Sequence, residues 1–245
     1  MILDIDAGNS WIKWRLHENE EIVQRGSQAT ASALDTGLEL PKIKTVSAVR
    51  LSSVANHSLT QQLYKQCLGE YSVELQVARV SAQVGQVTCG YEQPEKLGVD
   101  RWLAVLAAFD KYSQSVLVVD AGSALTLDLV GPEGQHLGGY ILPGKKLMRQ
   151  ALWQGTNGVK VEAEDVHNLM VPGVVTEEAV NRGCSLAAIG LIEKLAAQYP
   201  ASIVVTGGDA KMLIDGLSLQ ALHCPDLVLE GLCVSGVEYS SGAPD

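Results

Sequence analysis

The chain has 245 residues, of which 47% are hydrophobic and 19% charged, and its formal net charge at pH 7 is −10. This length and apolar content suffice for a large core in one or two domains, and they argue against a disordered chain. The acidic balance argues against nucleic acid as the main partner, because binding to a phosphate backbone needs a basic face. A local basic pocket for a small anion remains compatible with this charge.

The termini and cysteines predict a soluble, cytoplasmic protein with no membrane segment. The N-terminal apolar residues are interrupted by Asp4 and Asp6 and have no basic segment before them, so they predict a strand and not a signal peptide. No apolar run is long enough to cross a bilayer. The five cysteines include no Cys-x-x-Cys pair, which favours reduced thiols over a disulfide framework or a zinc site.

The first half of the chain predicts three strands followed by alternating helices and strands. The expected elements are strands at 1–5, 11–16 and 22–25, a weak helix over 29–40, a buried parallel strand at 44–49, a helix at 59–68 and a strand at 73–77. Residues 83–99 are punctuated by glycine and proline and are expected to form a loop, a candidate for closing over a substrate. A continuous apolar helix at 102–109 is expected to pack between the two halves.

The second half repeats the pattern. The expected elements are two strands around a turn within 116–130, a third strand at 137–142, a helix from about 145, an acidic loop at 162–172, a long helix at 176–198, a strand at 202–205, a short helix ending at 217, a last helix at 232–239 and a frayed tail from 240.

Three glycine turns follow apolar strands and organise this pattern. Asp6-Ala7-Gly8 and Asp120-Ala121-Gly122 occupy equivalent places in the two halves, and Thr206-Gly207-Gly208-Asp209 is the third. Three strands with crossover helices, duplicated, predict an α/β fold of two ribonuclease-H-like domains, as in the superfamily of actin, sugar kinases and heat-shock ATPases. We expect domains at 1–112 and 113–245, with the first two turns facing one site.

The first two turns suit phosphate and cation binding. A hairpin turn with exposed N–H groups and hydroxyls can hold the terminal phosphates of a nucleotide, and Lys13 can neutralise them. Asp120 is placed to hold the cation that accompanies a phosphate. The alternatives are an ordinary Asn/Gly hairpin after Asp6 and an aspartate that satisfies its own turn at Asp120.

The remaining candidates lie at expected helix starts. Asp100 could take a proton from a hydroxyl while Arg101 binds a carboxylate, although Asp100 is also a good N-cap. Arginine in a first turn opposes the helix dipole, which favours a functional role. The turn 206–209 fits an adenosine site or a tight turn capped by Asp209. Thr176, taken alone, predicts an N-cap.

Two other enzyme classes are disfavoured. Two Asp-x-Gly turns also occur in aspartic proteases, but those enzymes have Thr or Ser where this chain has Ala7 and Ala121, and they are almost entirely β. No Gly-x-x-x-x-Gly-Lys-Ser/Thr segment is present, so the chain is not a P-loop NTPase.

With these motifs in order, the chain resembles the type III pantothenate kinases over almost its whole length. The segments that carry the resemblance are Asp6-Ala7-Gly8-Asn9-Ser10-Trp11-Ile12-Lys13, Gly98-Val99-Asp100-Arg101, Asp120-Ala121-Gly122-Ser123-Ala124, Gly138-Gly139-Tyr140-Ile141-Leu142-Pro143-Gly144 and Thr206-Gly207-Gly208-Asp209. The Gly-x-Asp-Arg segment is the most specific of them. The resemblance implies ATP-dependent phosphorylation of pantothenate to 4′-phosphopantothenate, the first step of coenzyme A biosynthesis.

The resemblance also implies a role for particular residues. Asp100 would be the proton acceptor, Asp120 would bind a monovalent cation (K⁺ or NH₄⁺) needed alongside Mg²⁺, and Thr176 would be a substrate ligand. ATP would contact Asp6, Ala7, Gly8, Asn9, Ser10, Trp11, Ile12, Lys13 and Ser123. Pantothenate would contact Tyr91, Gly98, Val99, Asp100, Arg101 and Thr176.

The resemblance implies a homodimer as well, with the substrate site near the subunit interface. Position 123 departs from the family, which more often has Thr there; the hydroxyl is kept, although ATP affinity could differ. Two rival functions stay open on the sequence: a non-catalytic transcriptional regulator on the same fold, against which the net charge argues, and a sugar kinase, against which the Gly-x-Asp-Arg segment argues.

Overall fold

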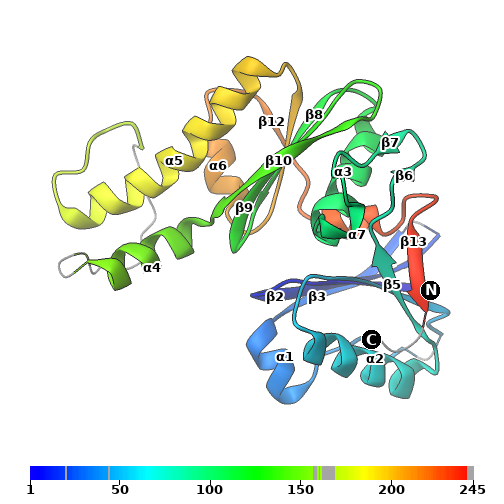
Figure 1. Ribbon diagram of the computed structural model, residues 1–245. Coiled ribbons are helices and arrows are strands. Elements are labelled where there is room, and N and C mark those ends of the chain that lie inside the picture. Colours follow the sequence, from blue (N-terminus) through cyan, green and yellow to red (C-terminus); the bar gives the residue numbers. More distant parts are fainter. Residues whose placement is uncertain (20, 44, 157–158, 160, 162–168, 242–245) are drawn as a thin grey trace. The chain divides into compact units, whose positions relative to one another are not determined.

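The computed structural model (Figure 1) describes residues 1–19, 21–43, 45–156, 159, 161 and 169–241. The chain forms two compact units: unit 1 comprises Met1–Lys111 and Asp226–Asp245, and unit 2 comprises Tyr112–Pro225. The division into domains 1–112 and 113–245 stays a prediction, and the compact units differ from it in the C-terminal segment, which belongs to unit 1. None of the helices in the described ranges is long and apolar enough to span a membrane.

Unit 1 contains a six-stranded sheet with the strand order β13-β5-β4-β1-β2-β3. Its strands are β1 (Ile2–Ala7), β2 (Trp11–Glu18), β3 (Glu21–Ala29), β4 (Ala48–Ser53), β5 (Leu75–Arg79) and β13 (Glu238–Ser241). β1 is antiparallel to β2 and parallel to β4, and β4 is parallel to β5. The carboxyl ends of the parallel strands β1 and β4 therefore share one edge of the sheet, where the first glycine turn begins.

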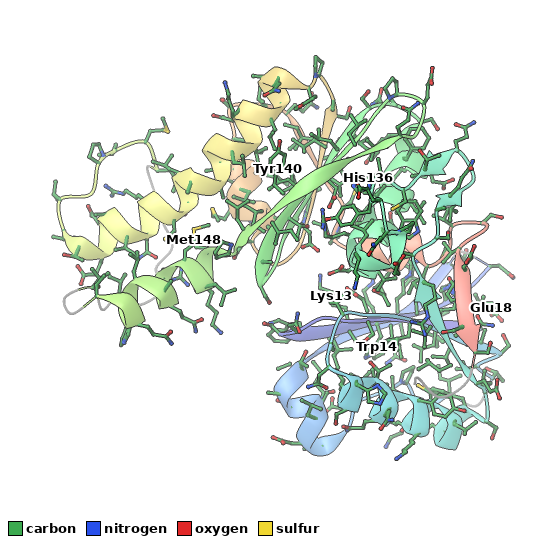
Figure 2. All side chains as sticks on the ribbon, in the orientation of Figure 1. Lys13, Trp14, Glu18, His136, Tyr140 and Met148 are labelled. Atoms are coloured by element: carbon green, nitrogen blue, oxygen red, sulfur yellow. The ribbon has the colours of Figure 1, made fainter. Side chains whose placement is uncertain are left out.

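One face of this sheet carries the core of unit 1. Leu3, Ile5, Trp14 and Leu51 alternate along their strands and are buried against α1 (Thr30–Thr36) and α2 (His57–Tyr71), which cover that face in Figure 1. Lys13, one residue before Trp14, points to the opposite face, as Figure 2 shows, because side chains alternate along a strand. The core therefore leaves the other face of the sheet for polar side chains.

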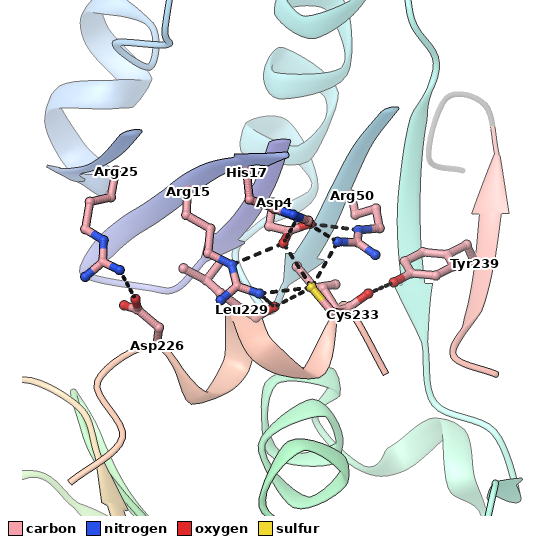
Figure 3. Close-up of polar contacts among 10 residues, drawn as sticks. Asp4, Arg15, His17, Arg25, Arg50, Asp226, Leu229, Cys233 and Tyr239 are labelled. Carbon is pink, nitrogen blue, oxygen red and sulfur yellow. Dashed lines mark hydrogen bonds and ion pairs between the residues drawn. The ribbon is translucent and has the colours of Figure 1, made fainter. Parts of the chain in front are cut away.

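That other face holds a buried ionic cluster around Asp4 (Figure 3). The Asp4 carboxylate is fully buried and accepts hydrogen bonds from Arg15 Nε (3.2 Å) and Arg50 Nε (2.7 Å), and it contacts His17 Nε2 at 3.0 Å. The thiol of Cys233, just beyond α7 (Leu227–Gly231), lies 3.0 Å from Arg15 Nη2. The cluster therefore attaches the C-terminal segment to strands β1, β2 and β4.

The segment 83–99 is more regular than a loop. It contains a two-stranded hairpin, β6 (Gln83–Val84) and β7 (Val87–Thr88), and a 3₁₀ helix, η1 (Pro94–Lys96). The predicted apolar helix is α3 (Val99–Tyr112), and every residue from Arg101 to Phe109 is buried. That this helix packs between the two halves of the chain stays a prediction.

Unit 2 contains a five-stranded sheet with the order β10-β9-β8-β11-β12. Its strands are β8 (Val116–Ala121), β9 (Ala124–Val130), β10 (His136–Pro143), β11 (Ser202–Thr206) and β12 (Ala221–His223), and its helices are α4 (Lys145–Gly155), α5 (Thr176–Gln198) and α6 (Ala210–Gly216). Leu117, Val119, Leu127 and Val205 pack with α5 and α6 in the core. The bounds of α5 agree with the predicted helix at 176–198.

Several expected elements are corrected. The last helix at 232–239 is wrong: α7 ends at Gly231, and Glu238–Ser241 form strand β13, paired antiparallel with β5. This pairing also orders residues 240–241 of the expected frayed tail, whereas residues 242–245 lie outside the described ones. The strand expected at 44–49 begins only at Ala48, and residue 44 is not described. Most of the acidic loop at 162–172 also falls outside the described ranges.

Candidate functional site

The first glycine turn is a short hairpin fixed from one side. Gly8 N donates to Trp11 O (3.0 Å), and Thr30, at the start of α1, donates from Oγ1 to Gly8 O (2.9 Å) and from N to Ser10 O (3.0 Å). A Cβ on Gly8 would lie 3.1 Å from Trp11 O. These bonds hold the backbone in place, while Asn9, Ser10 and Trp11 are exposed.

Asp6 and Lys13 stand opposite each other at the base of this turn. They are register partners on the antiparallel strands β1 and β2, and both are half-buried. Register partners on neighbouring strands project from the same face. A carboxylate and an ammonium group therefore border the turn on the polar face of unit 1, an arrangement that can serve a phosphate together with its cation.

The start of α3 combines Asp100, Arg101 and Tyr91. Asp100 is the second residue of the helix and not its N-cap, and its Oδ1 accepts a hydrogen bond from Arg101 N at 2.8 Å. Arg101 is 6% exposed; its Nη1 donates to Tyr91 Oη at 2.8 Å and its Cζ lies 5.6 Å from the centre of the Tyr91 ring. The structure thus brings together the carboxylate, the guanidinium and the phenol that the sequence singled out.

The Asp-Arg pair is placed by Gly98. A Cβ at Gly98 would lie 2.6 Å from Asp100 Oδ1, and Gly98 O accepts the first helical hydrogen bond, from Trp102 N at 3.0 Å. Glycine is therefore required for the Asp100 carboxylate to fold back over the start of the helix.

In unit 2, Gly144 and Gly207 lie against the second glycine turn, Asp120-Ala121-Gly122. A Cβ on Gly207 would lie 2.5 Å from Ala121 O and 2.6 Å from Asp120 Oδ1, and the φ angle of Gly207 is +93°. Gly144 N donates to Ser123 O (3.0 Å), and Asp209 N donates to Ala121 O (3.0 Å). The segments around residues 120, 144 and 207 therefore form one continuous backbone surface.

A pocket opens beside this surface. It is lined by polar backbone and by apolar side chains, namely Ala121, Gly122, Leu125, Gly144, Lys145, Met148, Cys184, Ala188, Asp209, Met212 and Leu213. Burial raises the pKa of the Cys184 thiol, so the thiol lines the pocket in its neutral form. Asp209 lines the pocket and makes no N-cap hydrogen bond to α6, in contrast to its simplest interpretation. Flexible thioethers beside glycine backbone suit a flat aromatic ring.

Asp120 stands between two threonines. Its register partners are Thr126 on the antiparallel strand β9 and Thr206 on the parallel strand β11, so all three side chains project from one face. Asp120 is half-buried and Thr206 is buried. A carboxylate with hydroxyl and backbone oxygens around it is a donor set suited to hard cations.

Thr176 is the first residue of α5, is exposed, and does not cap the helix, because Val175 occupies the N-cap position.

The candidate residues are divided between the two units. Unit 1 contains Asp6, Lys13, Tyr91, Asp100 and Arg101, and unit 2 contains Asp120, Ser123 and Thr176.

Sequence reasoning missed the side chains that line the pocket. Lys145, Met148, Cys184 and Met212 come from three different helices. Only Lys145 had a local signal, a basic residue at a helix start after Pro143-Gly144. The others have ordinary helical spacing, and only the packing of α4, α5 and α6 identifies them.

A second group in the described residues could hold a metal ion by distance alone: Asp4, His17 and Cys233. Arg15 and Arg50 already bind the Asp4 carboxylate there. The guanidinium groups of Arg15, which is buried, and Arg50, which is partly buried, oppose a divalent cation next to the ligand atoms, so this group is an ionic cluster and not a metal site.

Comparison with known proteins gives one family. Residues 2–198 match the sequence model of the family described as type III pantothenate kinase. The type III pantothenate kinase of Chromohalobacter salexigens is 38% identical over 244 residues, covering 95% of this chain and 86% of that protein. That of Ectopseudomonas mendocina is 37% identical over 246 residues, covering 96% and 98%.

Solved structures give the fold. A protein from Campylobacter jejuni named for the Baf family of transcriptional activators superposes with a TM-score of 0.62 at 21% identity, covering 94% of this chain and 95% of that one. A protein from Sinorhizobium meliloti named as a 2-dehydro-3-deoxygalactonokinase superposes with a TM-score of 0.59 at 13% identity, covering 95% and 97%. These superpositions over almost the whole chain confirm the predicted α/β fold.

Proposed function

The chain belongs to the type III pantothenate kinase family, and we propose how its own residues carry out the reaction of that family, the ATP-dependent phosphorylation of pantothenate. Phosphoryl transfer asks a protein mainly for positioning and for neutralisation of charge. The observation that carries the proposal is the start of α3, where Asp100 and Arg101 are fixed beside Tyr91.

Asp100 is the proposed base. The primary hydroxyl of pantothenate attacks the γ-phosphorus of ATP, a new O–P bond forms, and the bond from that phosphorus to the oxygen leaving with ADP breaks. Asp100 orients the hydroxyl and takes its proton. The hydrogen bond from Arg101 N fixes one oxygen of the Asp100 carboxylate at the helix start.

Arg101 is the proposed partner of the pantothenate carboxylate. A guanidinium binds a carboxylate bidentately, which fixes orientation as well as adding affinity. Tyr91 holds this guanidinium through a hydrogen bond and through its ring. Gly98, Val99 and Thr176 are the remaining proposed contacts of the substrate.

The first glycine turn is the proposed phosphate site. The exposed turn from Gly8 to Ser10 would offer N–H groups and hydroxyls to the terminal phosphates, and Lys13 would supply positive charge. The proposed ATP contacts are Asp6, Ala7, Gly8, Asn9, Ser10, Trp11, Ile12, Lys13 and Ser123. The pocket lined by Met148 and Met212 suits the adenine ring.

Kinases of this kind typically use a divalent cation, which we propose to be Mg²⁺, and Asp6 supplies a carboxylate oxygen suited to it. We assign the monovalent cation, K⁺ or NH₄⁺, to Asp120, whose threonine neighbours complete an oxygen-rich donor set. Bound cations would neutralise the charge of the transferring phosphoryl group.

We also propose a homodimer formed through unit 2. Large exposed apolar side chains are concentrated there: Leu137, Tyr140, Ile141, Leu147, Leu152, Trp153, Met170, Val171, Val174 and Val175. No residue of α4 is buried. Exposed apolar surface of this extent is typical of an interface. Ile141→Glu should shift the mass measured by light scattering toward that of the monomer. The control is Val23→Glu, at an exposed residue on β3 of unit 1, which should leave the mass unchanged. An unchanged mass for Ile141→Glu would refute this assignment.

A substrate panel tests the function. With ATP, Mg²⁺ and K⁺, release of ADP should depend on pantothenate and not on a hexose or a sugar acid. Asp100→Asn should lower kcat roughly 10²–10⁴-fold with no change in melting temperature, while Asp110→Asn, exposed on the same helix, should leave kcat unchanged. Turnover of a hexose, DNA binding without phosphorylation of pantothenate, or a fully active Asp100→Asn variant would contradict the proposal.

A further inference from the structure

Ser52 presents a buried hydroxyl with no partner. The residue is fully buried in β4, and its Oγ forms no hydrogen bond to any of the residues that the structure describes. Buried polar side-chain atoms are nearly always paired, because a hydroxyl that leaves water unpaired destabilises the fold. An unpaired hydroxyl in a core therefore suggests a partner that joins it when a ligand binds.

The neighbours of Ser52 indicate which partner this is. Ser52 is the register partner of Asp6 on the parallel strand β1, and Asp6 is in turn the register partner of Lys13 on β2. The three residues thus form a row across adjacent strands, each about 4.8 Å from the next. They share the polar face of the sheet, at the edge where β1 and β4 end and the first glycine turn begins.

The next serine along the strand behaves differently. Ser53 is the register partner of Ala7, so it points to the apolar face, and its Oγ is hydrogen-bonded to Thr60 Oγ1 at 2.9 Å. Ser53 therefore has a structural role between β4 and α2. Ser52 has no such role in the free chain, although the two serines are adjacent and lie in the same strand.

We propose that Ser52 is a positioning residue for Asp6: its hydroxyl donates to the Asp6 carboxylate when that carboxylate turns to the divalent cation of bound ATP. The donated hydrogen bond holds one carboxylate oxygen, so the other faces the cation. Lys13 balances the charge of Asp6 from the opposite strand. This inference rests on the proposed phosphate site and adds to it a residue from outside the turn.

Binding of MgATP without pantothenate tests the inference by titration calorimetry. Ser52→Ala should weaken MgATP binding about tenfold, the usual effect of losing a hydrogen bond to a charged group, and should raise the Mg²⁺ concentration for half-maximal rate to a similar extent. The KM for pantothenate should not change. Ser52→Thr, which keeps the hydroxyl, should restore binding to within about twofold of the original chain.

Thermal unfolding of the free protein separates positioning from structure. Ser52→Ala should leave the melting temperature unchanged or raise it, because it removes an unpaired buried hydroxyl. Ser53→Ala should lower the melting temperature and leave MgATP binding unchanged. A lowered melting temperature for Ser52→Ala with normal MgATP binding would overturn the inference.

The Asp6→Asn variant separates a failure of the inference on Ser52 from a failure of the proposed phosphate site. If Asp6→Asn weakens MgATP binding but Ser52→Ala does not, the role of Ser52 is refuted and the phosphate site stands. If Asp6→Asn also binds MgATP normally, the phosphate site itself is refuted, and the inference on Ser52 is refuted with it.

Discussion

Replacing Asp4 with asparagine should destabilise unit 1 strongly. In the described part of the chain, the side chains in contact with the Asp4 carboxylate are those of Arg15, His17, Arg50 and Cys233, and none of them is a second carboxylate. The Asp4 carboxylate thus supplies the negative charge between the guanidinium groups of Arg15 and Arg50. Asp4→Asn removes this negative charge at a position that is fully buried and leaves the two guanidinium groups without their counter-charge.

The size of the effect follows from the uncompensated charges. Removing one partner of a buried ion pair typically costs about 3–5 kcal/mol, because the remaining charge stays buried. The asparagine carbonyl can still accept one hydrogen bond, which places the expected loss near the lower limit, about 3 kcal/mol. For a unit of this size, the melting temperature should fall by roughly 10 °C.

Urea unfolding at pH 7, followed by tryptophan fluorescence, measures the loss, because Trp11, Trp14 and Trp102 all belong to unit 1. The matched control is Asp226→Asn, which removes the more exposed ion pair with Arg25 (3.4 Å). Exposed pairs contribute about 0–1 kcal/mol. If both variants lose the same small free energy, the buried charges around Asp4 do not stabilise the fold.

The same cluster gives a dependence on pH. Burial by itself would raise the pKa of Asp4, but hydrogen bonds from His17 and Arg50, with the charges of Arg50 and Arg15, outweigh it and lower the pKa. A lowered folded-state pKa means that the stabilisation is complete above the unfolded pKa, about 3.9, and is lost as the pH falls through the folded value. The difference in stability between the original chain and Asp4→Asn should therefore be constant above about pH 5 and shrink below pH 4.

Two further predictions concern the candidate site. Gly207→Ala should destabilise unit 2 by more than about 2 kcal/mol in urea unfolding, because the φ angle is +93° and a Cβ would lie 2.5 Å from the Ala121 backbone. The control Gly208→Ala, whose Cβ would have nothing within 4 Å, should have little effect. Equal losses of stability in the two variants would show that the turn adjusts to the extra methyl group. Tyr91→Phe keeps the ring over Arg101 but loses the 2.8 Å hydrogen bond, so the KM for pantothenate should rise about fivefold with kcat little changed, and a fall in kcat alone would place Tyr91 in the chemical step.

Elements with a strong local pattern could be predicted from the sequence. The helix at 176–198 has acidic residues in its first turn and apolar spacing along its length, and its bounds agree with α5. The two Asp-Ala-Gly turns follow strands whose apolar residues are consecutive or alternate, so β1, β2, β8 and β9 were all expected. In these segments, propensity and burial favour the same structure.

Elements that depend on distant partners could not be predicted. Strand β13 has the sequence Glu-Tyr-Ser-Ser, which carries no strand signal, and it forms because its backbone pairs with β5. The sequence suggested a helix at 232–239 instead, a range that overlaps the strand at Glu238 and Tyr239. Asp4 reads in the sequence as an interruption of an apolar strand, and its three basic partners come from β2 and β4.

The candidate site divides in the same way. Asp100, Arg101, Asp6 and Asp120 belong to short motifs whose residue types already suggest chemistry, whereas Ser52 has no motif and is an ordinary serine in an ordinary strand. Its distinguishing property is physical: a fully buried hydroxyl with no hydrogen-bond partner among the described residues, next to the carboxylate of the proposed phosphate-binding turn. A sequence records which groups can donate a hydrogen bond, but only a folded chain shows which donors have been left unpaired. The proposal on Ser52 therefore depends on the folded structure and could not have come from a motif.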